Sequence, residues 1–417
     1  MKHAGIFSFA FLASLLLSCA TAAVKPPATP SLQRNIDQLL AASSTAKAIW
    51  GIVVEDDNGK VLYAHNAHTL LTPASNRKLF SAATDANCIG LTSQLTTELW
   101  IDGPDVVIRG DGDPSFGSQR HGSPGFTPFV AALEARHVTE VRDVIADVSR
   151  FDAVTIPSSW KVGNLPSGYS APVDALAFDE NTIGEDSVPN AAIWTAMRFR
   201  DALVGAGIAV SGSVRVRRER PPCAGADCAG LQSAGAAAPS GQRIAVIESP
   251  MLAQLLMSVL KNSQNLYAEM LFKRSSPSGS YDESEELERR FATTEAGVSP
   301  DEMHLVDGCG LSPDDLVTPA ALVQVLRWMN APERRGTWWM ILAQPGNEGT
   351  LHNRLTNLSA RLRGKTGTIN GVNALSGIVA GEKGGYRYFS ILVNHHIGDS
   401  GDAVRTMDEI AQEIAKF

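Results

Sequence analysis

The stretch Thr72-Pro73-Ala74-Ser75-Asn76-Arg77-Lys78-Leu79-Phe80 decides how this chain folds and where its chemistry lies. Pro73 closes a loop, and the apolar run after Lys78 indicates a buried helix with Ser75 at its N-terminus, where the helix dipole favours negative charge. Residues three apart share a helix face, so the Lys78 amine is expected beside the Ser75 hydroxyl. A hydroxyl needs a neighbouring base to become a nucleophile, and a desolvated lysine can be that base. The pattern predicts Ser75 as a nucleophile and Lys78 as its general base.

Two further motifs lie downstream. Ser263-Gln264-Asn265 precedes an apolar helical pattern, and Lys365-Thr366-Gly367 precedes β-prone runs at 372–380 and 386–393 that predict antiparallel strands. Each motif alone is common, since S-x-x-K also occurs on solvated helix faces, S-x-N in caps and turns, and K-T-G in hairpins. Together, in this order and in these local contexts, they are the active-site set of penicillin-interacting serine enzymes.

The residues around these motifs resemble the D-Ala-D-Ala carboxypeptidase/endopeptidase family, the class C low-molecular-mass penicillin-binding proteins of the penicillin-binding protein 4-like type. The resemblance runs in the family's order from about Ile49 to the C-terminus. It is carried by Gly112-Asp113-Pro114-Ser115, Ala146-Asp147-Val148-Ser149-Arg150-Phe151-Asp152, Tyr169-Ser170-Ala171-Pro172-Val173-Asp174-Ala175-Leu176, Asn262-Ser263-Gln264-Asn265-Leu266-Tyr267-Ala268-Glu269-Met270-Leu271, Asp307-Gly308-Cys309-Gly310-Leu311-Ser312, Val317-Thr318-Pro319 and Glu348-Gly349-Thr350-Leu351.

The resemblance implies a catalytic role for five residues. Ser75 would be the nucleophile and Lys78 its base, kept neutral or proton-sharing by the nearby Lys365. Lys365 and Ser263 would relay the proton to the leaving amine. Asn265 would help to hold Lys78 and the substrate backbone.

Substrate binding is expected along the third motif. The backbone N–H groups of Ser75 and Thr368 would form the oxyanion hole. Thr366, Gly367 and Thr368 would receive the terminal carboxylate of the substrate, with Lys365 supplying positive charge. This is the chemistry of a peptide that ends in D-Ala, and of a penicillin that mimics it.

Asp147 has two interpretations. The resemblance places an acid here, facing the active site, where it could hold the free amine of a diaminopimelic side chain. Alternatively, Asp147 is a turn acid after a strand, and the sequence favours neither interpretation.

The expected elements predict an α+β protein. An antiparallel sheet flanked by terminal helices, together with a helical block, gives the transpeptidase-like catalytic domain of penicillin-recognising enzymes. This domain is expected to be discontinuous, formed by 24–95 and 245–417, with a smaller α+β domain inserted at 96–244. The insert looks shorter than is usual for the family, because 179–183 run almost directly into the segment 193–212.

Several local elements are also predicted. Ser284 is expected to be the N-cap of a helix over 284–296. A strand is expected over 209–216. The segment 221–242 is rich in Ala, Gly, Pro and Ser and is expected to be a flexible loop.

Composition restricts the class of protein. The chain has 417 residues, of which 44% are hydrophobic and 19% charged, as in ordinary globular proteins. The formal net charge is -8 without a basic run, which argues against nucleic-acid binding.

The N-terminus predicts export, with a secretory signal over 1–23. A small-x-small site at Ala20-Thr21-Ala22 favours soluble release into the periplasm. Alternatively, Leu16-Leu17-Ser18-Cys19 resembles a lipoprotein box, which would make the protein an outer-membrane lipoprotein anchored at Cys19. The two alternatives are almost equally supported. No later segment is apolar enough to be an integral membrane span.

The remaining cysteines have separate interpretations. Cys223 and Cys228 are expected to pair in an oxidising compartment. Cys88 is expected to be a buried small hydrophobe. Cys309 stands where the family usually has serine and is interpreted as a neutral replacement in a tight turn.

The sequence thus predicts a serine D-alanyl-D-alanine carboxypeptidase/endopeptidase that acts on peptidoglycan stem peptides and is acylated by β-lactams. The alternatives are a β-lactamase or esterase on the same scaffold, and a non-catalytic wall-binding module, although such a module would be expected to lose Ser75, Lys78 or Lys365. No metal or cofactor is expected.

Overall fold

The computed structural model describes residues 1, 31–218, 241–382 and 384–417. Residues Leu32–Phe417 form one compact unit that contains every described helix and strand. Its principal sheet has five antiparallel strands, in the order β14 (Leu362–Ile369), β15 (Val372–Ala380), β16 (Tyr386–Asn394), β1 (Ile49–Asp56) and β2 (Val61–His65). The strand that carries Lys365 therefore lies at a sheet edge.

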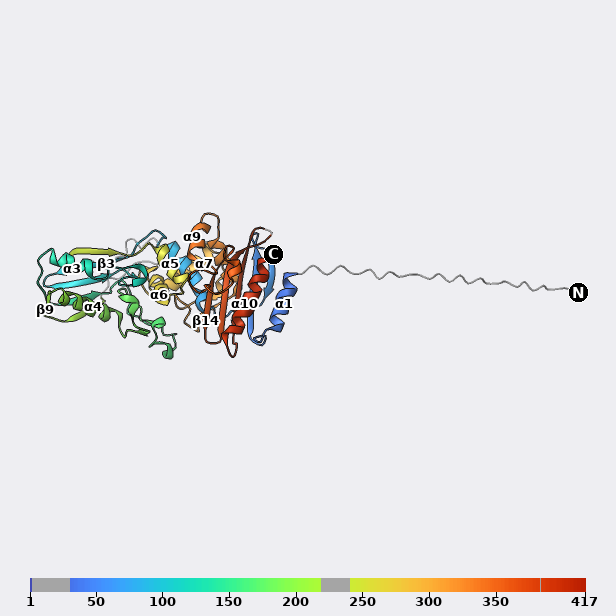
Figure 1. The fold of residues 1–417 in the computed structure, drawn as a ribbon, viewed down its shortest axis with the longest axis horizontal. Coiled ribbons are helices and arrows are strands. Elements are labelled where there is room, and N and C mark those ends of the chain that lie inside the picture. The colour runs from blue at the N-terminus through green and yellow to red at the C-terminus, as the bar shows by residue number, and fades with distance from the viewer. Residues whose placement is uncertain (2–30, 219–240, 383) are drawn as a thin grey trace. The chain divides into compact units, whose positions relative to one another are not determined.

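Helices cover both faces of this sheet. Along β1, alternate residues point to opposite faces, so Trp50, Ile52 and Val54 enter one hydrophobic cluster and Val53 another. The first cluster lies beneath α1 (Leu32–Ala42) and α10 (Ser400–Ala415), which pack against each other beside β14 and its neighbours (Figure 1). The opposite face packs on α8 (Pro319–Met329).

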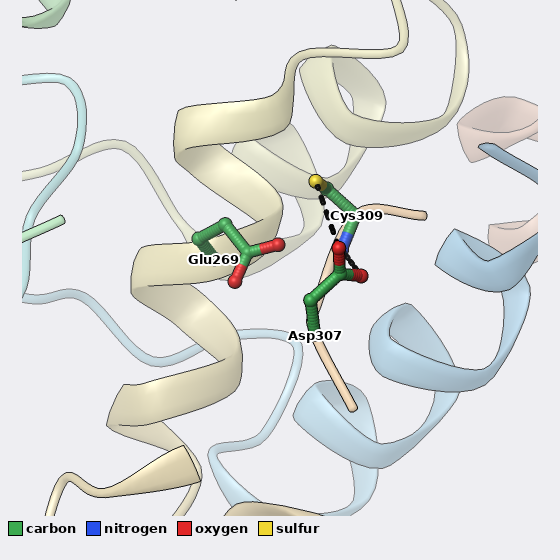
Figure 2. A group of neighbouring side chains, drawn as sticks. All are labelled: Glu269, Asp307 and Cys309. Atoms are coloured by element: carbon green, nitrogen blue, oxygen red, sulfur yellow. Dashed lines mark hydrogen bonds between the residues drawn. The ribbon is translucent and has the colours of Figure 1, made fainter. Parts of the chain in front are cut away.

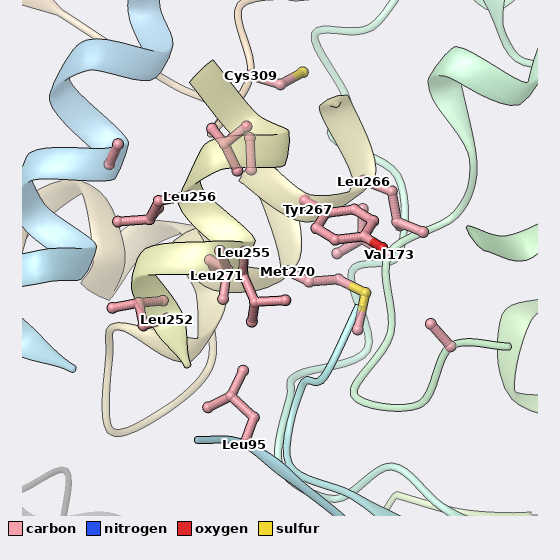
Figure 3. Packing of buried hydrophobic residues seen from close by; sticks show 14 of the residues in the cluster. Leu95, Val173, Leu252, Leu255, Leu256, Leu266, Tyr267, Met270, Leu271 and Cys309 are labelled. Atoms are coloured by element: carbon pink, nitrogen blue, oxygen red, sulfur yellow. The ribbon is translucent and has the colours of Figure 1, made fainter. Parts of the chain in front are cut away.

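A block of helices follows this second face. It comprises α2 (Lys78–Cys88), α5 (Leu252–Leu260), α6 (Asn265–Arg274), α7 (Tyr281–Thr294) and α9 (Arg335–Ile341). Figure 3 shows Leu252, Leu255 and Leu256 of α5 packing with Leu266, Tyr267, Met270 and Leu271 of α6. Leu95 and Val173, from outside these helices, belong to the same cluster. Because α6 begins at Asn265, this packing fixes the second motif.

The second sheet is mixed and lies mostly within the segment 96–244 expected as an insert, although its strand β11 continues beyond that boundary to Glu248. Its order is β10 (Val214–Arg217), β6 (Val144–Asp147), β4 (Asp105–Gly110), β3 (Thr96–Asp102) and β11 (Gln242–Glu248). The pairs β10–β6 and β4–β6 are parallel, and the others are antiparallel. Helices α3 (Thr127–Glu134) and α4 (Ala191–Gly205) pack against its strands (Figure 1).

Three two-stranded ladders complete the described strands. They are β5 (Glu140–Val141) with β9 (Ala209–Val210), β7 (Thr182–Ile183) with β8 (Asp186–Ser187), and β12 (Met303–His304) with β13 (Leu316–Val317). Among the described helices, none is both long and apolar enough to cross a membrane.

Some local predictions were wrong. The N-cap of α7 is Ser280, whose hydroxyl accepts the Glu283 N–H, whereas Ser284 is buried one turn inside the helix. The strand expected at 209–216 is divided into β9 and β10, because its two ends pair with different partners, β5 and β6. Helix α9 and strand β11 were not predicted.

Cys88 also differs from its prediction. It is only partly buried and is disulfide-bonded rather than packed as a free small hydrophobe. Its partner lies outside the described residues. The predicted signal over 1–23, the anchor at Cys19, the Cys223–Cys228 pairing and the loop at 221–242 fall wholly or mostly outside the described residues.

Candidate active site

The Ser75–Lys78 pair lies where a short 3-10 turn meets a helix. Ala74–Arg77 form the turn η1, and α2 begins at Lys78. The buried Lys78 amine donates hydrogen bonds to Ser75 Oγ at 2.9 Å, to Asn265 Oδ1 at 2.7 Å and to the Cys309 carbonyl at 2.6 Å. The structure thus brings the first and second motifs together on one amine.

Lys365 joins the second and third motifs. Its side chain is fully buried, and its amine donates to Ser263 Oγ at 2.8 Å and to the Thr366 carbonyl at 2.7 Å. Ser263 itself has a positive φ of 62°, which places its side chain at the start of α6. The five residues predicted as catalytic therefore form two hydrogen-bonded groups, Ser75–Lys78–Asn265 and Ser263–Lys365, which the motif Ser263-Gln264-Asn265 connects along the chain.

Burial changes the acidity of both amines. It lowers the pKa of Lys78 below its ordinary value, against the opposing influence of Cys309, Asp307 and Glu269. Burial, and then the neighbouring charge of Lys78, lowers the pKa of Lys365 well below its usual range. Burial rather than Lys365 is thus the main cause that favours a neutral Lys78, as a base requires.

Strand β14 presents the third motif to this group. Gly367 approaches η1 so closely that an added Cβ would lie 3.0 Å from the Ser75 N and 2.9 Å from the Pro73 carbonyl oxygen. Side chains alternate along a strand, so Thr366 and Thr368 lie on the other face from Lys365 and Gly367. The Thr368 hydroxyl is exposed and accepts a hydrogen bond from Asn373 Nδ2 at 3.0 Å.

Two buried carboxylates hold the turn beneath Lys78. Glu269 of α6 accepts the Gly308 N–H at 2.9 Å, and Asp307 accepts the N–H groups of Cys309 and Gly310 at 3.0 and 2.6 Å. Figure 2 shows Glu269 approaching this turn from its helix. The turn is therefore fixed with the Cys309 carbonyl directed at the Lys78 amine.

Glu269, Asp307 and Cys309 each offer one potential metal-ligand atom, and these three atoms lie within 4.8 Å of one another (Figure 2). Their hydrogen bonds argue against such a use. Asp307 Oδ2 also accepts from Trp160 Nε1 and the Ser312 N–H, at 2.9 and 2.8 Å. Burial raises the pKa of the Cys309 thiol well above its usual range, so the thiol stays protonated, which agrees with a neutral replacement.

The structure places Asp147 at the end of β6. Its side chain is 1% exposed, and its carboxylate accepts the Ser149 N–H at 3.1 Å and lies 3.9 Å from an Arg217 nitrogen. These are contacts within the second sheet and the turn that follows β6. They favour the interpretation of Asp147 as a turn acid over that of an amine-binding residue.

Sequence reasoning missed several residues that support the site. The Asn76 amide links η1 to the sheet, in the orientation that donates to the Lys365 carbonyl at 2.9 Å and accepts the Ser376 N–H at 3.1 Å. Arg77 is fully buried and pairs with Glu288 of α7 at 2.5 Å. Both lie within the first motif, between Ser75 and Lys78, so their position in the sequence could have indicated a supporting role. The Tyr169 carbonyl accepts Asn265 Nδ2 at 2.8 Å. Tyr169 lies in a stretch that carries the family resemblance, but any residue can supply a backbone carbonyl, so the sequence did not indicate this contact.

Comparison with known proteins agrees with this geometry. The chain matches the model of the D-Ala-D-Ala carboxypeptidase 3 (S13) family over residues 32–196 and 187–414. It is 28% identical to a D-alanyl-D-alanine carboxypeptidase of Actinomadura sp. (strain R39), covering 93% of this chain and 85% of that protein. It is 25% identical to carboxypeptidase DacB of Mycolicibacterium smegmatis, covering 83% of this chain and 76% of that protein.

The fold is also that of solved penicillin-binding proteins. The crystal structure of penicillin binding protein 4 from Haemophilus influenzae superposes with a TM-score of 0.77 at 19% identity, covering 92% of this chain and all of that chain. The penicillin G-acylated endopeptidase Bd3459 of Bdellovibrio bacteriovorus superposes with a TM-score of 0.53 at 14% identity, covering 88% of this chain and 91% of that chain. The chain belongs to the D-Ala-D-Ala carboxypeptidase 3 (S13) family.

Proposed function

We propose that the protein is a serine D-alanyl-D-alanine carboxypeptidase and endopeptidase that acts on peptidoglycan peptides through an acyl-enzyme. The observation that carries the proposal is the buried Lys78 amine, 2.9 Å from Ser75 Oγ and 2.7 Å from Asn265 Oδ1. Membership of the family supports the same substrate class. The catalytic segments are 24–95 and 245–417, with 96–244 as an inserted domain.

The reaction uses residues of both hydrogen-bonded groups. Ser75 Oγ attacks the carbonyl carbon of the penultimate D-Ala as the neutral Lys78 amine takes its proton. The bond to the terminal D-Ala nitrogen then breaks, and Ser263, beside Lys365, passes a proton to that leaving amine. Water later attacks the ester on Ser75 and frees the shortened peptide. A β-lactam undergoes the same first step: Ser75 Oγ attacks its ring carbonyl, the ring amide bond breaks, and an ester on Ser75 remains.

The edge strand supplies the binding contacts. The N–H groups of Ser75 and Thr368 stabilise the oxyanion. Thr366, Gly367 and Thr368 line the place of the substrate carboxylate. The burial of Asp147 and its contact with the Ser149 N–H support its interpretation as a turn acid, so the proposed arrangement does not use it.

The substrate places the enzyme outside the cytoplasm, in agreement with the leader-like N-terminus. After export, the two alternatives are a soluble periplasmic form and a form anchored to lipid. Both leave the residues of the site unchanged.

Gly367→Ala is expected to slow acylation by about a hundredfold to a thousandfold, as does the loss of one oxyanion-hole donor. The physical reason is that the new methyl would collide with the Ser75 amide and the Pro73 carbonyl. The measurement is the acylation rate with a fluorescent penicillin. Gly336→Ala in α9 is the matched control, since nothing lies within 4 Å of its added Cβ. An unchanged rate in Gly367→Ala would show that the close approach of Gly367 does not position the Ser75 N–H for the oxyanion hole.

The whole proposal is tested by incubating the purified protein with cross-linked muropeptides and weighing the products by mass spectrometry. We expect pentapeptide stems to lose one alanine and D-Ala-linked dimers to separate into monomers. Nitrocefin given in excess should acylate the protein without sustained turnover. Rapid nitrocefin hydrolysis with intact muropeptides would instead identify a β-lactamase.

A further inference from the structure

The turn η5 (Asp179–Asn181) has an unusual backbone. Its three residues, none of them glycine, have left-handed φ angles of 50°, 57° and 55°. Asp and Asn tolerate this conformation because their short polar side chains can hydrogen-bond locally, but Glu180 has no such advantage. Left-handed residues of this kind persist only where their surroundings over-determine them, and they concentrate at functional sites.

Contacts of the neighbouring residues hold this turn. The buried Asn181 accepts the Phe178 N–H at 3.1 Å and donates to the Pro172 carbonyl at 3.0 Å. The Asp179 N–H donates to the Phe116 carbonyl at 3.1 Å. The backbone of the turn is thus fixed without the side chain of Glu180, which is left to make contacts elsewhere.

That side chain reaches the second motif. Glu180 Oε2 accepts a hydrogen bond from Gln264 Nε2 at 2.6 Å. Its Oε1 accepts from Ser118 Oγ at 2.8 Å, Arg120 Nε at 3.0 Å and Tyr267 OH at 3.3 Å. The carboxylate therefore joins the segment around 118–120 to the middle residue of Ser263-Gln264-Asn265 and to α6.

The motif needs such support because both neighbours of Gln264 carry catalytic contacts. Ser263 is itself left-handed, with a φ of 62°, and its hydroxyl accepts from Lys365. Asn265 accepts from Lys78. Two other hydrogen bonds anchor the motif among the described residues. The Gln264 N–H donates to the Ser258 carbonyl at 3.1 Å, and Asn265 Nδ2 donates to the Tyr169 carbonyl.

We propose that Glu180 is a positioning residue that holds Ser263 and Asn265 against the two lysines by fixing the side chain of Gln264. This inference rests on the proposed function. A charge-assisted hydrogen bond is stronger than a neutral one, so its loss should misplace both catalytic contacts at once. Two anchors remain in its absence, so the motif should loosen rather than collapse.

The test compares Glu180→Asn, Gln264→Ala and the double variant. Asn tolerates the left-handed backbone but is too short to reach Gln264. We expect the limiting acylation rate with a fluorescent penicillin, per active site that the penicillin can label, to fall about tenfold in each single variant. The double variant should fall by the same factor, because the Glu180–Gln264 hydrogen bond is the contact that all three variants lose. The half-saturating penicillin concentration should change less than about twofold, since the carboxylate-binding strand is untouched.

Asp105→Asn is the matched control. Asp105, like Glu180, is paired with an arginine: it accepts two hydrogen bonds from Arg142, at 2.9 and 2.7 Å, but in the second sheet and away from the motifs. Its acylation rate should equal that of the wild type. A wild-type rate in Glu180→Asn, or a multiplied loss in the double variant, would overturn the inference while leaving the proposed function intact. Failure of the wild type to be acylated would overturn both.

Discussion

Ser75→Ala is expected to lose all covalent labelling by a fluorescent penicillin and to lower peptide turnover by more than about a thousandfold. Ser75 Oγ is 2.9 Å from the Lys78 amine, so it has a base within reach of its proton. Without the oxygen no ester can form, whatever the remaining binding contacts. Gel fluorescence and the release of D-Ala from a pentapeptide measure the two effects.

Ser263→Ala is the informative comparison for this variant. Ser263 Oγ also lies beside a buried amine, 2.8 Å from that of Lys365. We expect labelling of Ser263→Ala to be slower but complete, because proton transfer to the leaving group is impaired while the nucleophile remains. Labelling of Ser75→Ala together with none of Ser263→Ala would show that the roles of the two serines are reversed.

Lys78→Ala is expected to reduce the acylation rate by at least about a hundredfold, the usual contribution of a general base. Lys78→Arg should be equally slow, because arginine keeps the positive charge but cannot give up its proton. The comparison therefore separates a role as a base from a role as a charge. Stopped-flow acylation by a chromogenic β-lactam measures both variants. A rate near that of the wild type in Lys78→Arg would mean that Lys78 acts only as a cation.

The pH dependence of the wild type follows from the same residue. Lys78 acts as a base only when neutral, so acylation should fall as the pH drops through its pKa. Burial lowers this pKa from the ordinary value of 10.5, so the fall lies at lower pH than for a free lysine. Lys78→Ala should lose this dependence. An acid limb of acylation that persists unchanged in Lys78→Ala would belong to another group.

The sequence by itself determined the parts of the protein that depend on local pattern. The expected terminal helices are present as α1 and α10, and the β-prone runs at 372–380 and 386–393 are present as β15 and β16. The Ser75–Lys78 spacing placed the hydroxyl and the amine together, because a single helical turn sets that distance. The pattern was wrong about the N-cap of α7, which is Ser280 and not the predicted Ser284.

Only the tertiary structure determined which residues that are far apart in the sequence come into contact. The burial that lowers the pKa of Lys78 arises from the packing of α2, α6 and the turn at 307–310, which no local pattern specifies. The burial of Asp147 and the reach of Glu180 to Gln264 depend likewise on how the segments around the second sheet meet the helical block. Motifs name the reactive groups because their chemistry is local, but the protonation and position of those groups depend on the packing that excludes water from them.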